Sequence, residues 1–205
     1  MLVLHCLKVA RDKDINLGRN SRIFAMLAAR KQLEVLEADV KWRSFPEHKL
    51  LQAKFLAEAG KPLESLEIVN KLLDQNKEDS PELVFLYAKL AAHLGQSQYL
   101  VKAGGLLAKF ASRPDETGIE AIRHMTLIHT AIPIANQGLV RCLELLNINP
   151  HAKPIDFLRI HALRFDSASQ EHDKRVVLEE CAEIFDLKDN SQLEIYCRWL
   201  GRLRT

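Results

Sequence analysis

Apolar residues recur at helical spacing along most of this chain. Between Ser21 and about Arg43 they occupy positions that share one face of a helix, namely Ile23, Met26, Leu27, Leu33, Leu36 and Val40. Ser21 is a residue type that caps helix N-termini, and the stretch from Leu2 to Asp12 shows the same kind of spacing. The pattern therefore predicts a short helix at 2–12 and a long helix from Ser21 to Arg43.

A pattern of helix, glycine and second helix occurs twice between residues 47 and 111. The first copy covers 47–76 with Gly60 at its bend, and the second covers 81–111 with Gly95 at its bend, 35 residues further on. Glycine adopts the left-handed backbone conformation that ends many helices at no steric cost. The sequence therefore predicts two consecutive helical hairpins of matching layout.

The helical spacing continues towards the end of the chain. It predicts further helices at about 117–131, 134–147, 154–167, 172–186 and 190–203. The second helices of successive hairpins then begin near residues 62, 97, 134 and 172, a period of roughly 35 to 38 residues, as in solenoids of two-helix units. We therefore predict one domain over 1–205, with atypical N-terminal helices at 1–43, repeat hairpins at 47–186 and a terminal helix at 190–203.

Two adjacent glycines lie inside one of the predicted second helices. Gly104 and Gly105 fall in the middle of the helix that follows Gly95. A glycine in a helix interior costs about 1 kcal/mol relative to alanine. We therefore expect close packing of a neighbouring helix at this point, or a kink.

The period and the bend glycines resemble those of tetratricopeptide repeats, a family of helical hairpins with a repeat of about 34 residues. Ala53 and Ala88 each lie seven residues before a bend glycine and match the small residues of the family's first helix. The chain departs from the family at Ser65 and Leu100, where the family favours alanine, and at Gly104, where it favours a bulky ring. The resemblance implies an all-α fold, a right-handed α-solenoid of about five antiparallel helical hairpins.

Composition agrees with a helical chain that has a sizeable core. Of the 205 residues 47% are hydrophobic, and only 8 are glycine and 7 proline, whereas an all-β chain needs many tight turns. The net charge of +2 is too small to indicate a nucleic acid or a membrane as a partner. The four cysteines form no Cys-x-x-Cys pair and lie among apolar residues, which favours buried thiols in a reducing compartment. We therefore expect a cytoplasmic protein.

No motif for catalysis, cofactor binding or metal binding is present. The chain lacks a phosphate-binding loop, a nucleophile elbow and a His-Glu-x-x-His zinc helix. Four histidines lie within 38 residues, namely His124, His129, His151 and His161. The first two are five residues apart, about 140° around a helix, and cannot chelate one ion together. We therefore interpret the histidines as solvated or capping, and predict no enzyme, no cofactor and no metal.

The candidate binding residues are cations on the predicted first helices. Lys54 and Lys89 occupy matching positions, six residues before each bend glycine. The resemblance implies that this surface faces a concave groove, where cations hold acidic peptide segments or a terminal carboxylate. Arg123, Arg159 and Arg164 also fall on predicted first helices. The alternative for each is an ordinary solvated side chain.

These observations predict a non-catalytic scaffold for protein–protein interaction. It binds a partner segment with acidic groups in its concave groove. Two alternatives stay open: a helical accessory or assembly region of a multi-subunit or multi-domain enzyme, and a helical repeat that binds RNA or another polyanion. Phosphate binding weakens steeply with salt, and this separates the last alternative from the first.

Both ends of the predicted solenoid are apolar. A solenoid needs a polar outer face on its terminal units, but the first and last predicted helices each expose an apolar stripe in their sequences. We therefore expect at least one end to pack against a second copy of the chain or a neighbouring subunit. The candidate residues for this end interface are Leu4, Tyr196 and Trp199.

Overall fold

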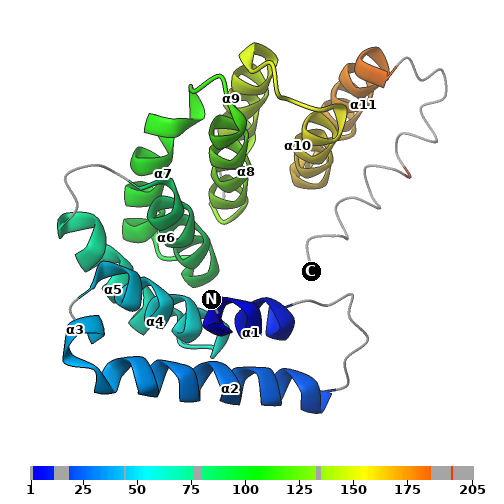
Figure 1. The fold of residues 1–205 in the computed structure, drawn as a ribbon. Helices are drawn as coiled ribbons and strands as arrows, with labels where there is room; N and C mark the ends of the chain where they lie inside the picture. The colour runs from blue at the N-terminus through cyan, green and yellow to red at the C-terminus, as the bar shows by residue number, and fades with distance from the viewer. Residues whose placement is uncertain are drawn as a thin grey trace. The chain divides into compact units, whose positions relative to one another are not determined.

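The fold is all-helical in the part of the chain that the structure describes (Figure 1). The structure is a computed structural model, and it describes residues 2–11, 19–43, 45–75, 80–132, 135–185 and 195. Within these ranges it contains eleven α-helices and no strand. The predicted all-α class is therefore confirmed.

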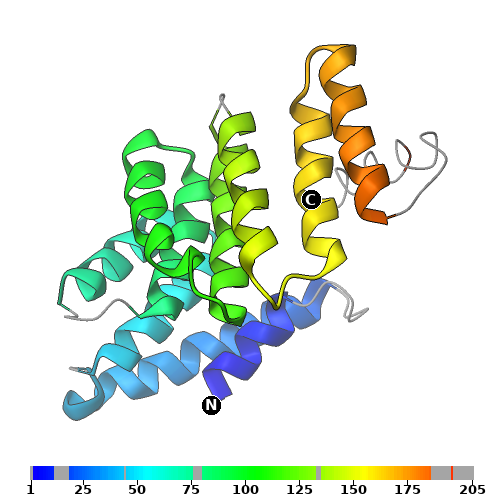
Figure 2. The same ribbon diagram turned by 90° about the horizontal axis from the view of Figure 1, so that it is seen from above.

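The chain divides into two compact units, Met1–Leu94 and Gly95–Thr205, and each is described by itself. Unit 1 contains α1 (Leu2–Arg11), α2 (Arg19–Ala38), α3 (Val40–Arg43), α4 (Pro46–Glu58), α5 (Pro62–Gln75) and α6 (Pro81–Leu94). Unit 2 contains α7 (Ser97–Ala111), α8 (Glu116–Thr130), α9 (Ala135–Ile148), α10 (Pro154–Ser167) and α11 (Glu171–Phe185). Figure 2 shows the same helices from above.

The helix starts confirm the predicted repeat period. The first helices α4, α6, α8 and α10 begin at Pro46, Pro81, Glu116 and Pro154. The second helices α5, α7, α9 and α11 begin at Pro62, Ser97, Ala135 and Glu171. The bend glycines Gly60 and Gly95 have φ angles of 76° and 66°, a region that L side chains rarely adopt. Within each unit, helices that are adjacent in sequence pack against each other.

The predicted unbroken helix from Ser21 to Arg43 is wrong. The helix ends at Ala38, and a separate short helix begins at Val40. Asp39 causes the break, because its Oδ1 accepts a hydrogen bond from the backbone N–H of Lys41 at 2.9 Å. A short acidic side chain that caps backbone amides in this way competes with continued helix.

The predicted terminal helix at 190–203 lies outside the described residues, except for Ile195.

Each unit has its own buried core. In unit 1, α1 and α2 bury Val3, Leu7, Ala29 and Leu33, and Leu51 and Phe55 of α4 pack against this cluster.

The hydroxyl of Ser65 is fully buried and donates to the carbonyl oxygen of Ala53 at 2.7 Å, which joins α5 to α4. In unit 2, a second cluster packs α10 on α11 and contains Leu158, Ala162, Phe165, Val177 and Cys181.

A buried asparagine joins two connections of unit 2. Asn149 is 7% exposed, and its amide nitrogen donates to the carbonyl oxygens of Arg113 at 2.9 Å and Asp115 at 3.2 Å. Its side-chain oxygen accepts from the backbone N–H of His151 at 2.9 Å. The connection between α7 and α8 is therefore held directly against the connection between α9 and α10.

The expected close packing at Gly104 and Gly105 is wrong. The helix α7 runs from Ser97 to Ala111, and a Cβ added at either glycine would meet nothing within 4 Å. Alanine at both positions should therefore raise the free energy of unfolding by about 1–2 kcal/mol, because it restricts the unfolded chain without a clash in the fold. Urea unfolding followed by circular dichroism measures this change.

Gly118 in α8 provides the matched control for this prediction. A Cβ at Gly118 would lie 2.1 Å from the backbone oxygen of Arg113 and 3.0 Å from Nδ2 of Asn149. Gly118→Ala should therefore destabilise the protein under the same conditions. A loss of stability for the Gly104/Gly105 double variant would contradict the open space around these two positions.

Candidate functional site

The two candidate lysines lie on neighbouring first helices of unit 1, and each faces a glutamate of the other helix. The ammonium group of Lys54 on α4 forms an ion pair with Glu82 on α6. In return, Nζ of Lys89 on α6 lies 4.0 Å from Oε1 of Glu58 on α4. The side chain of Lys54 is 25% exposed and that of Lys89 is 47% exposed. The structure thus brings both lysines to one helix pair, together with two carboxylates that the sequence prediction missed.

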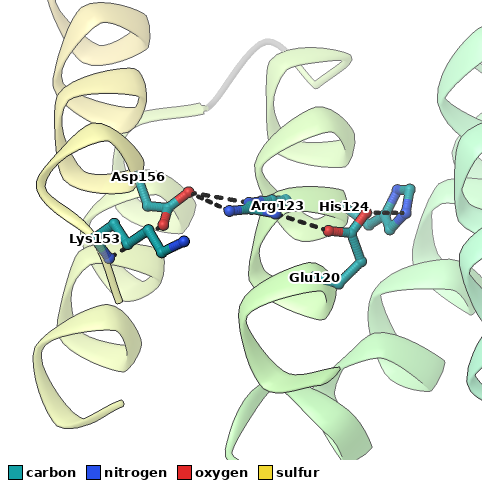
Figure 3. Close-up of polar contacts among 5 residues, drawn as sticks. All are labelled: Glu120, Arg123, His124, Lys153 and Asp156. Carbon is teal, nitrogen blue, oxygen red and sulfur yellow. Dashed lines mark hydrogen bonds and ion pairs between the residues drawn. The ribbon is translucent and has the colours of Figure 1, made fainter. Parts of the chain in front are cut away.

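Arg123 of α8 binds a buried carboxylate of α10 in unit 2. Its Nε and one terminal nitrogen donate to Oδ1 of Asp156 at 3.0 and 2.8 Å, and Figure 3 shows the guanidinium between Asp156 and Glu120. The other terminal nitrogen donates to Glu120 at 3.1 Å. The second oxygen of Asp156 accepts from the backbone N–H of Lys153 at 3.2 Å, where α10 begins. Asp156 therefore both caps α10 and joins it to α8.

These partners set the proton affinity of Arg123. Partial burial alone would lower the pKa of Arg123, but the hydrogen bonds and negative charges of Asp156, and then of Glu120, raise it above its ordinary value. Glu120 also lies 3.5 Å from Nε2 of the half-buried His124 (Figure 3). Arg123 is therefore a fixed positive charge at the centre of a polar chain between α8 and α10.

The same type of ion pair links consecutive first helices in both units. Lys54 lies eight residues after the start of α4, and Arg123 lies seven residues after the start of α8. Their partners, Glu82 and Asp156, lie in the first turn of the next first helix. A carboxylate in the first turn also interacts favourably with the helix dipole. The sequence signal for this link is an acid in the first turn of a first helix, 28 or 33 residues after a cation on the preceding first helix.

Arg164 is engaged inside unit 2, whereas Arg159 is exposed. The guanidinium of Arg164 is buried at the C-terminal end of α10 and forms an ion pair with Glu180 of α11. Arg159 is exposed and makes no hydrogen bond or ion pair with the residues that the structure describes. Of the five predicted cations, only Lys54 and Lys89 share one surface of unit 1.

His161 lies beside Arg164 and is not solvated, in contrast to the prediction. The residue is 2% exposed, and its Nδ1 accepts a hydrogen bond from Arg164 at 3.4 Å. Burial and then the charge of Arg164 lower the pKa of His161 to about 4, although Glu180 opposes this shift. Burial also lowers the pKa of His129. His161 is therefore neutral at pH 7.

The described cysteines lie in or beside the core. Cys142 and Cys181 are fully buried, as predicted, and Cys6 is half-buried. Burial raises the pKa of Cys142 to about 11, although a side-chain hydrogen bond with Thr126 opposes the shift. A thiol with this pKa is a poor nucleophile at neutral pH. Among the described residues, no group of three or more His, Cys, Asp or Glu side chains has the geometry to hold a metal ion.

The predicted end-interface residues are only partly described. Leu4 of α1 is 44% exposed, as an interface residue of the free chain would be. Tyr196 and Trp199 lie outside the described residues. None of the described helices is both long enough and apolar enough to span a bilayer.

Comparison of the chain with known protein families, with curated proteins and with solved structures gives no match.

Proposed function

We propose that the chain is a non-catalytic scaffold for protein–protein interaction, with its first helices stacked as in a right-handed, tetratricopeptide-like solenoid. The observation that carries the proposal is the recurring ion pair between consecutive first helices, Lys54–Glu82 in unit 1 and Arg123–Asp156 in unit 2. Within each unit, two consecutive first helices joined in this way form one rigid surface. A preorganised surface binds a partner segment without an ordering cost of its own.

We place the partner segment on the first helices of unit 1. Four charged side chains are gathered there, namely Lys54, Glu58, Glu82 and Lys89. Lys89 is nearly half exposed and its contact with Glu58 is long, at 4.0 Å. Because an ammonium group has three N–H donors, Lys89 can also donate a hydrogen bond to a carboxylate of a partner. Lys54 is more buried and mainly holds Glu82 in place.

Replacing both lysines by glutamine should weaken binding of an acidic partner segment by roughly 1–3 kcal/mol, because charge-assisted hydrogen bonds are lost. Glutamine is preferred to glutamate here, since a new carboxylate at position 54 would repel Glu82. A partner captured by pull-down and identified by mass spectrometry is titrated against both proteins by calorimetry at two salt concentrations.

Lys61→Gln is the matched control. Lys61 also lies in unit 1 and also pairs with a glutamate, Glu64, at 2.8 Å, but it lies at the start of a second helix. The Lys61→Gln variant should bind the acidic partner segment with the same affinity as the wild type. Equal affinities for the wild type and the folded Lys54/Lys89 double variant would remove the lysines from the site. Two results together would favour a polyanion-binding repeat instead. The chain would bind nucleic acid with an affinity that falls steeply as the salt concentration rises, and the double variant would bind protein partners as the wild type does.

A further inference from the structure

The imidazole ring of His129 packs directly against the backbone of Gly138 in unit 2. His129 lies in the last turn of α8, Gly138 is the fourth residue of α9, and Figure 1 shows the two helices side by side. A Cβ at Gly138 would lie 2.2 Å from Nδ1 and 2.4 Å from both Cγ and Cε1 of His129. Glycine at this position therefore leaves the room that the ring occupies. Because glycine also weakens a helix by about 1 kcal/mol relative to alanine, the first turns of α9 depend on the ring that covers them.

The contact with Gly138 favours the neutral form of the ring. His129 is half-buried, and burial alone lowers its pKa below the ordinary value. On α8 itself the other titratable groups are Glu116, Glu120, Arg123 and His124, and the helices packed on α8 are α7, α9 and α10. The titratable side chains of these three helices are Tyr99, Lys102, Lys109, Arg141, Cys142, Glu144, Asp156, Arg159, His161, Arg164 and Asp166. None of these charges contributes to the shift at His129, so no acid holds an imidazolium against Gly138.

A protonated ring has a more favourable position close by. His129 is the basic residue in the last turn of α8, where the carbonyl groups form the negative end of the helix dipole. A ring that turns away from Gly138 keeps this interaction and regains its hydration. The neutral and the charged ring therefore favour different positions at the same helix end.

We propose that His129 and Gly138 form an acid-sensitive latch, in which the neutral ring holds the first turns of α9 on α8 and the protonated ring releases them. The release is local, because Leu139, Cys142 and Leu146 anchor the rest of α9 and are 0%, 0% and 1% exposed. Since the pKa of His129 is lowered in the closed form, protons bind preferentially to the open form. The closed form is therefore favoured above about pH 6.5 and loses this advantage as the pH falls below that value.

Titration of the histidine ring protons of the full chain by NMR tests the contact. In the wild type His129 should titrate below its ordinary pKa. Gly138→Ala should displace the ring and move its pKa back towards about 6.5, because the new methyl group takes the place of the ring. Gly105→Ala is the matched control, since a Cβ there meets nothing within 4 Å, and it should leave the titration of His129 unchanged. A His129 pKa that Gly138→Ala does not raise would overturn the proposal.

Amide hydrogen exchange in the first half of α9 tests the release. In the wild type, exchange at 139–143 should be at least about fivefold faster at about pH 5 than at about pH 7.5, after correction for the intrinsic rates. His129→Gln should remove this difference, because a neutral amide takes up no proton in this range. This second variant also tests the latch if Gly138→Ala does not fold. Exchange that is independent of pH in the wild type, or equally dependent on pH in His129→Gln, would overturn the proposal.

Discussion

Asp156→Ala is expected to lower the free energy of unfolding by about 2–4 kcal/mol, because it removes a buried carboxylate with three donors. Asp156 is 3% exposed and binds both the guanidinium of Arg123 and the backbone N–H of Lys153. The variant therefore loses the start of α10 and the link to α8 at once. Urea unfolding followed by circular dichroism at neutral pH measures the change.

Glu120→Gln separates the buried contact from the exposed one. Glu120 binds the same guanidinium from its exposed side, and its side chain is 44% exposed. Pairs of this kind contribute roughly 0–1 kcal/mol, so the variant should be close to wild type. A similar loss for Asp156→Ala and Glu120→Gln would show that the buried position of Asp156 does not matter.

The second large effect is expected in the pH dependence of the free energy of unfolding, at acidic pH. In the unfolded chain His161 takes up a proton near pH 6.5, but in the fold its pKa is lowered to about 4 by burial first and by Arg164 second. Protons therefore bind preferentially to the unfolded state as the pH falls between these values. Stability should be unaffected by this group above about pH 6.5 and should fall on the order of 3 kcal/mol by pH 4.

His161→Phe should remove this part of the acid sensitivity, because a phenyl ring fills the site without taking up a proton. The groups that face His161 are Arg164 on its own helix and Glu180 on α11, and both remain in the variant. Urea unfolding at several pH values between 7 and 4.5 compares the slopes. His151→Phe, at an exposed histidine, should keep the wild-type slope. Parallel profiles for wild type and His161→Phe would contradict the lowered pKa.

Local signals in the sequence were sufficient to predict the helices of the hairpins. Bend glycines with positive φ at Gly60 and Gly95, and proline at the first position of α4, α5, α6 and α10, fix where these helices end and begin. The break at Asp39 could not be predicted, because the apolar periodicity continues past this residue. The hydrogen bond that competes with the helix comes from the side chain of Asp39 alone. Gly104 and Gly105 were misinterpreted, since sequence alone does not distinguish a close contact from open space.

The candidate site could be predicted only in part. The matching positions of Lys54 and Lys89 could be predicted from their equal distance to the bend glycines. The structure places both lysines on the α4–α6 pair. Their partners Glu58 and Glu82 come from neighbouring helices, and the pairing depends on how the helices are offset along their axes. The burial of His161 was missed for a similar reason, because its surroundings are completed by Glu180 of α11, 19 residues further along the chain.

The amide of Asn149 has a consequence for how unit 2 can vary in evolution or in design. It bonds the connection at Arg113–Asp115 to the connection at Asn149–His151. An insertion in either connection would displace the other, so the lengths of these two loops are expected to change only together. The connection between α10 and α11, at 168–170, carries no such tie to another loop within the described chain. An added peptide or a grafted recognition loop therefore belongs at 168–170.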